Sequence, residues 1–129
     1  MNIPKNLLYT KDHEWVRIEG KIAYIGITDY AQSSLGDITF VELPKQKELL
    51  TQSKHCATVE SVKAASDVYA PLSGKVLSVN TQLETHPELI NQSAYEKGYF
   101  FSMEVMNEAE KLNLMKASDY QSYCEGIAK

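Results

Sequence analysis

The sequence predicts one mostly antiparallel β domain with small helices attached. Short runs of strand-forming residues recur along the chain, several of them alternating between apolar and polar side chains. Turn-forming residues separate these runs, and no low-complexity linker or shift in composition divides residues 1–129. With 43% hydrophobic and 23% charged residues, the chain has the balance of an ordinary globular protein. We therefore expect a single domain.

The predicted strands are short and follow one another closely. Glu19-Gly20 supplies a turn within the first hairpin, Pro44 ends the third strand, and Pro71 and Gly74 form a later turn. In chain order the expected strands are residues 13–18, 21–27, 38–43, 48–50, 56–62, 67–70, 75–79 and 99–105.

The helices are expected to be few and mostly short. Thr28 can cap a helix over residues 29–35, which Gly36 would terminate. In the C-terminal part, residues 112–127, Ser118-Asp119 is the expected cap of a second helix whose apolar residues recur at helical spacing.

Composition excludes several classes of function. The net charge of -4 argues against a protein that binds duplex nucleic acid, because such a protein needs a basic face to neutralise phosphates. Apolar runs fall short of the roughly 20 residues of a membrane span, and the first residues do not resemble a secretory signal. Cys56 and Cys124 fit two reduced thiols. We expect a cytoplasmic protein, monomeric, with neither nucleic acid nor membrane as a partner.

A lysine stands at the tip of the predicted central hairpin. Its neighbours are the small residues Ser61, Ala64, Ala65 and Ser66. An exposed lysine at such a tip is usually only a solubilising charge, but the small residues leave this amine open to an approaching enzyme. Glu60 and Asp67 favour the charged ammonium, which disfavours Lys63 as a catalytic nucleophile. We interpret Lys63 as an acceptor of an acyl group, which would remove its charge.

Other candidate sites are weaker. The three histidines match no zinc-ligand spacing, and no catalytic triad or phosphate-binding loop is present in the sequence. Four acidic residues could bind a cation or an amine, although solvated surface charge is the simpler interpretation; they are Asp12, Glu14, Glu60 and Asp67. We therefore expect a protein without catalytic apparatus of its own, and no metal site.

These residues belong to a longer pattern. It comprises residues 9–16, 26–32, 35–38, 40–44, 59–64, 66–69, 71–74, 79–80, 87–91 and 95. Through these blocks the chain closely resembles the H-protein family of the glycine cleavage system over nearly its whole length. The resemblance implies a flattened barrel-sandwich hybrid of the biotinyl/lipoyl type, with short helices and a C-terminal helix. It also implies that lipoic acid is attached covalently at Lys63.

The resemblance implies a carrier function and a set of partners. A lipoyl carrier of this family shuttles the aminomethyl group of glycine from the glycine decarboxylase to the folate-dependent aminomethyltransferase. Dihydrolipoamide dehydrogenase then reoxidises the dithiol, and a lipoate-attaching enzyme installs the group. By family position, Glu60 would guide that enzyme, while Glu14 and Asp67 would line a cleft for the loaded arm.

The chain also departs from the family pattern. In the segment after Pro44, the family usually has glycines at the positions of Lys47, Ser53 and Ala57. Non-glycine residues enter positive φ at a cost, so we expect this edge of the domain to be shaped differently or to be looser. Tyr99 replaces a usual tryptophan, and Ser34 a histidine that lines the cleft in some members.

Four alternatives remain open at this point. A lipoyl relay that supplies 2-oxoacid dehydrogenase complexes would share the same fold. A biotin carrier resembles Met-Lys-Met around its lysine, which Val62-Lys63-Ala64 does not match. The remaining alternatives are an enzyme with its own active site and a plain structural or binding domain, in which Lys63 would be dispensable.

Overall fold

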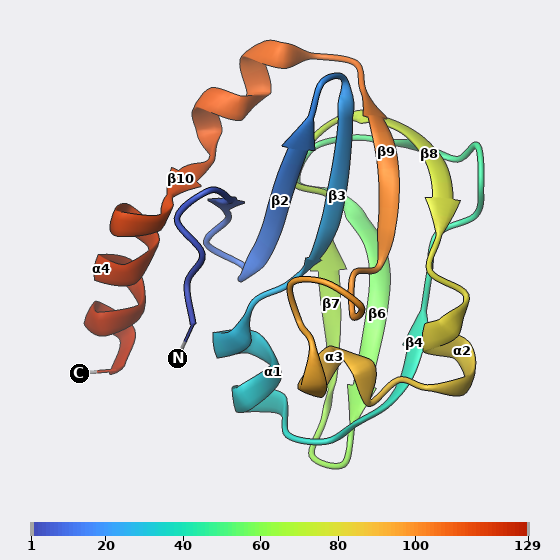
Figure 1. Ribbon diagram of the computed structural model, residues 1–129, viewed down its shortest axis with the longest axis vertical. Helices are drawn as coiled ribbons and strands as arrows, with labels where there is room; N and C mark the ends of the chain where they lie inside the picture. Colours follow the sequence, from blue (N-terminus) through green and yellow to red (C-terminus); the bar gives the residue numbers. More distant parts are fainter. Residues whose placement is uncertain (1, 129) are drawn as a thin grey trace.

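The computed structural model describes residues 2–128, which form two antiparallel sheets packed face to face (Figure 1). The larger sheet has the order β10-β1-β2-β3-β9-β8-β5, and the smaller one the order β4-β6-β7. The strands are β1 Leu8–Tyr9, β2 Glu14–Glu19, β3 Ile22–Ile27, β4 Ile38–Glu42, β5 Leu49–Leu50, β6 His55–Ser61, β7 Ala65–Tyr69, β8 Gly74–Val79, β9 Phe101–Val105 and β10 Met115–Lys116. The predicted class, mainly β with short helices and a C-terminal helix, is confirmed.

The helices lie outside the two sheets. They are α1 Asp29–Leu35, α2 Gln82–Thr85, α3 Leu89–Gln92, the 3-10 helix η1 Glu108–Asn113 and α4 Ala117–Ala128. The predicted ends of α1 are confirmed, since the Thr28 side chain accepts a hydrogen bond from the N–H of Ala31 and Gly36 follows the helix with φ 79°. The predicted cap of α4 is wrong, because the helix already begins at Ala117 and Ser118-Asp119 lies in its first turn.

The main hydrophobic core fills the space between the sheets. Inward-facing side chains of both layers are almost completely buried, among them Ile25, Val41, Val59, Val76 and Phe101. Alternation along the strands explains this arrangement, because every second side chain of a strand points to the same face. The smaller sheet therefore has one face in the core and one face in solvent.

A second, aromatic cluster joins the C-terminal helix to the larger sheet. Tyr9 of β1 stacks on Tyr120 of α4 with ring centroids 4.6 Å apart. The Tyr120 hydroxyl lies 2.7 Å from Thr28 Oγ1 and 2.7 Å from His13 Nδ1. These two hydrogen bonds connect α4 both to the turn before β2 and to the cap of α1.

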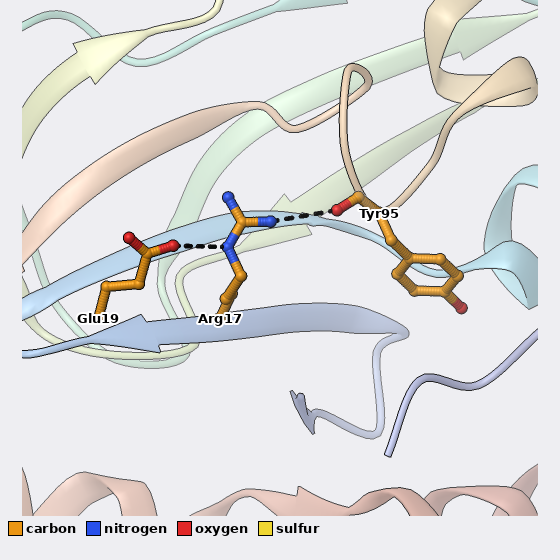
Figure 2. Close-up of polar contacts among 3 residues, drawn as sticks. All are labelled: Arg17, Glu19 and Tyr95. Atoms are coloured by element: carbon orange, nitrogen blue, oxygen red, sulfur yellow. Dashed lines mark hydrogen bonds and ion pairs between the residues drawn. The ribbon is translucent and has the colours of Figure 1, made fainter. Parts of the chain in front are cut away.

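Arg17 fixes the segment between α3 and β9 on the outer face of the larger sheet. Figure 2 shows its guanidinium between Glu19 and the backbone of Tyr95. Nε lies 2.9 Å from the Glu19 carboxylate, and Nη1 donates to the Tyr95 carbonyl at 3.3 Å. The guanidinium carbon also lies 4.6 Å from the ring centroid of Tyr24, which is cation–π geometry.

At the edge after Pro44, two of the residues that stand in place of family glycines enter positive φ despite its cost. Lys47 and Ser53 do adopt positive φ, 73° and 72° respectively, although neither is glycine. Tertiary hydrogen bonds hold both positions, since the Lys47 N–H donates to the Val76 carbonyl and the Ser53 N–H to the Ala70 carbonyl, each at 2.8 Å. The local strain is retained because the surrounding backbone fixes these conformations.

Candidate functional site

The turn that carries Lys63 is held by its own backbone and one serine. The Ser61 N–H donates to the Ala64 carbonyl at 2.8 Å. The Ser61 hydroxyl oxygen accepts from the N–H groups of Lys63 and Ala64 at 3.1 and 3.2 Å. Val62 and Lys63 keep ordinary negative φ, which explains why the turn does without the Asn-Gly pair of many two-residue hairpins.

The turn is also attached to the segment that follows α1. The Val62 N–H donates to the Asp37 carbonyl at 3.0 Å. A Cβ placed on Gly36 would lie only 3.5 Å from Lys63 Cε, so the aliphatic stem of the lysine passes over this glycine. In Figure 1 the β6–β7 hairpin ends beside the chain between α1 and β4. Lys63 is exposed, and its backbone is anchored from both sides.

Glu60 and Asp67 lie on the solvent face of the smaller sheet. Glu60 is directly opposite Ala65, and Asp67 is directly opposite Thr58. Both carboxylates are exposed, and Asp67 Oδ1 lies 3.7 Å from His55 Nε2. The two acids therefore flank the lysine hairpin on the surface, and neither is buried with Glu14.

Glu14 differs from the other candidate acids because it is buried, with only 1% of its surface exposed. Its carboxylate accepts from the Thr10 hydroxyl at 2.5 Å and from the Tyr69 N–H at 3.1 Å. Burial raises the pKa of Glu14 to about 7, and these two hydrogen bonds oppose the rise. A carboxyl group in this state takes up or releases a proton near neutral pH.

Glu14 is one wall of a pocket of about 320 Å³. The lining comes from four parts of the chain and comprises Thr10, Lys11, Asp12, Glu14, Gln52, Ser53, Tyr69, Ala70, Pro71, Asn113 and Leu114. Lys63, Glu60 and Asp67 are not among these residues, so the structure separates Glu14 from the other three predicted site residues. Gln52 and Asn113 were not predicted, because they lie far apart in sequence and their amides match no motif.

One side of the pocket is held by hydrogen bonds between distant segments. Asn113 Nδ2 donates to Gln52 Oε1 at 3.0 Å, and the Gln52 N–H donates to the Ser73 hydroxyl at 2.9 Å. Ser73 in turn donates to both carboxylate oxygens of Glu110, from N–H at 2.7 Å and from Oγ at 2.8 Å. This network fixes η1 against the strand connections, so the pocket wall is preformed.

The helices of residues 2–128 include none that is long and apolar enough to cross a membrane. The two cysteines, Cys56 and Cys124, are buried and free, and burial raises the pKa of the Cys56 thiol to about 12. Within the same described range, the His, Cys, Asp and Glu side chains form no group of three or more that could hold a metal ion.

Comparisons with known proteins agree with one another. A family model described as "Glycine cleavage H-protein" matches residues 7–127. The glycine cleavage system H protein of Halothermothrix orenii is 46% identical over 127 residues, 98% of this chain and 99% of the relative. That of Symbiobacterium thermophilum is 50% identical over 122 residues, 95% of each chain.

A solved structure extends the agreement to three dimensions. The crystal structure of a glycine cleavage system H protein from Mycobacterium marinum superposes with a TM-score of 0.83 and 36% identity. The match covers 93% of this chain and 97% of that one. Sequence blocks, fold and comparisons therefore lead to one conclusion: this chain belongs to the glycine cleavage H-protein family.

Proposed function

We propose that this chain is a non-catalytic lipoyl carrier of the glycine cleavage system, with lipoic acid attached covalently to Lys63. The observation that carries the proposal is the anchored, solvent-exposed Lys63 turn in a chain of this family. The lysine stem lies over Gly36 without an ion pair to hold its amine in the described structure, so the site fits an acyl group on Nζ.

Attachment is an acyl transfer. Nζ loses a proton and attacks the carbonyl carbon of an activated lipoyl group, such as a mixed anhydride with a phosphate. An amide C–N bond forms, and the bond from the carbonyl carbon to the leaving group breaks. Glu60 lies three residues before Lys63 and is exposed beside the turn, where the lipoate-attaching enzyme can contact it.

The Glu14 pocket gives the loaded arm a protected end point. A bound lipoyl group would supply a disulfide that accepts the aminomethyl group derived from glycine. Within the pocket, the Glu14 carboxylate can pair with a cationic amine, and the approach of that cation would lower the carboxyl pKa below about 7. The buried surroundings strengthen this ion pair and limit access of water to the amine.

The partners follow from the carrier function. We infer that the chain acts as one carrier domain and meets the glycine decarboxylase, the aminomethyltransferase and dihydrolipoamide dehydrogenase in turn. Asp67 lies beside His55 on the open sheet face and outside the Glu14 pocket. We therefore assign the amine to Glu14 rather than to Asp67.

Intact-mass measurement tests the proposal. Incubation with a lipoate-attaching enzyme, ATP and lipoate should add one lipoyl group to the wild-type chain, and Lys63→Arg should remain unmodified. The modified protein should then support glycine-dependent formation of CO₂ together with the other three components. An unmodified wild-type chain would contradict the carrier function. Complementation of a strain that lacks lipoylated 2-oxoacid dehydrogenases would instead support the relay alternative.

A further inference from the structure

Strand β4 contains an irregularity that changes which of its side chains face solvent. Ile38 pairs with Ser61 and Phe40 pairs with Glu60, so Thr39 is an extra residue opposite the partner strand. Such a β-bulge reverses the alternation beyond it. Ile38 is 4% exposed and Val41 is also 4% exposed, whereas Phe40 is 51% exposed. In a regular strand Phe40 would share the buried face of Ile38.

Local contacts hold the bulge in place. The Thr39 hydroxyl donates to the Glu60 carbonyl at 3.2 Å, which ties the extra residue to the central strand of the sheet. Phe40 consequently stands directly opposite Glu60, on the same solvent face. The fold holds a large aromatic ring in water beside the acid that precedes the lysine hairpin.

A second apolar side chain adjoins the lysine itself. Val62 is 66% exposed, and its Cγ2 lies by Gly36, as does the stem of Lys63. The exposed acidic side chains on or beside this sheet are Asp37, Glu42, Glu60 and Asp67. The surface around the lysine thus combines apolar contacts with negative charge, and it is complementary to a partner with an apolar patch in a basic surface.

We propose that Phe40 and Val62 form the apolar contact by which the lipoate-attaching enzyme binds this chain. The proposal rests on the carrier function proposed above and names a surface for one of its partners. The short reach of the lysine side chain favours this occupant. The attaching enzyme must bring Nζ itself to its reactive carbonyl carbon, and the lysine stem has only four carbons, so that enzyme covers the turn. Enzymes that act on the far end of the finished arm reach it at a distance from the turn.

The test compares rates of lipoylation between variants that keep the fold. Phe40→Thr and Val62→Thr each replace an exposed apolar side chain by a smaller, polar, β-branched one that suits a strand or its end. Leu49→Thr is the matched control. Leu49 is 68% exposed in the larger sheet and pairs with Lys75. We expect Phe40→Thr to lower kcat/KM for lipoylation about tenfold, mainly through KM, as is typical of an aromatic contact residue. Val62→Thr should lower it less, and Leu49→Thr should leave it unchanged.

Two further measurements decide the outcome. Urea unfolding midpoints of the variants should match the wild type, which separates lost contact from lost fold. Once fully lipoylated and reduced to the dithiol, Phe40→Thr should be reoxidised by dihydrolipoamide dehydrogenase, with NAD⁺ as the oxidant, at the wild-type rate. Equal lipoylation rates for wild type and Phe40→Thr would overturn this inference and leave the carrier function standing. A comparable loss in the dehydrogenase assay would overturn the choice of the attaching enzyme. A wild-type chain that is never lipoylated would refute the carrier function itself.

Discussion

Replacement of Glu14 by glutamine should flatten the pH dependence of the free energy of unfolding. The pKa of Glu14 rises from 4.5 to about 7 on folding, because the carboxyl is buried. The folded state therefore binds the proton more tightly than the unfolded state does. This contribution to stability is fully present below pH 4.5 and is lost as the pH rises through 7.

The size of the effect follows from the two pKa values. Their difference of about 2.5 corresponds to about 3 kcal/mol, since one pKa unit equals about 1.4 kcal/mol. Glu14 is 1% exposed, so solvent screening reduces this figure little. Glutamine matches the uncharged carboxyl in shape and does not titrate. The free energy of unfolding of Glu14→Gln relative to wild type should therefore rise by about 3 kcal/mol between pH 4.5 and pH 8.

Urea unfolding at pH 4.5, 5.5, 6.5, 7.5 and 8 would measure this difference. Glu60→Gln is the matched control for the loss of an exposed carboxylate. Parallel curves for wild type and Glu14→Gln would refute the reasoning, since they would place the carboxyl pKa near its ordinary value in the folded state. A bound amine should lower the pKa of Glu14 in the folded state and so move this pH dependence of stability toward lower pH.

Three other substitutions test the local structure by urea unfolding. Ser61→Ala removes the acceptor of two turn N–H groups and should cost about 1 kcal/mol, with lipoylation slowed; an unchanged midpoint would contradict the proposed support of the turn. Ser53→Gly should stabilise the protein by up to about 1 kcal/mol by relieving φ 72°, and destabilisation would show that the conformation is not strained. Tyr120→Phe leaves His13 and Thr28 without its hydroxyl and should cost roughly 1–3 kcal/mol, whereas a neutral result would mean that these bonds add nothing.

The strands could be predicted because their signals are local. Alternating side chains and turn residues locate the lysine hairpin, the first hairpin and the cap of α1 without any tertiary information. The short elements α2, η1, β1 and β10 were not predicted. Each has two to six residues, too few for a periodic pattern, and its contacts with the rest of the fold decide its conformation.

The candidate site was predicted only in part for the same reason. Lys63 stands out within its own hairpin. Glu14 was one of four acidic candidates and was singled out by family position, but the pocket that it lines also depends on Gln52 and Asn113 from distant segments. The outward position of Phe40 depends on a bulge that strict alternation does not foresee. The positive φ of Ser53 depends on a hydrogen bond to Ala70, which no sequence window contains.

Glu14 also has a consequence for how other chains can meet this one. β7 is an edge strand of the smaller sheet, and an edge strand offers unpaired N–H groups to which a foreign strand can add. At Tyr69 that donor is already bound to the Glu14 carboxylate. The buried acid therefore occupies the donor that an added β-strand would need at this end of the edge, where the pocket opens.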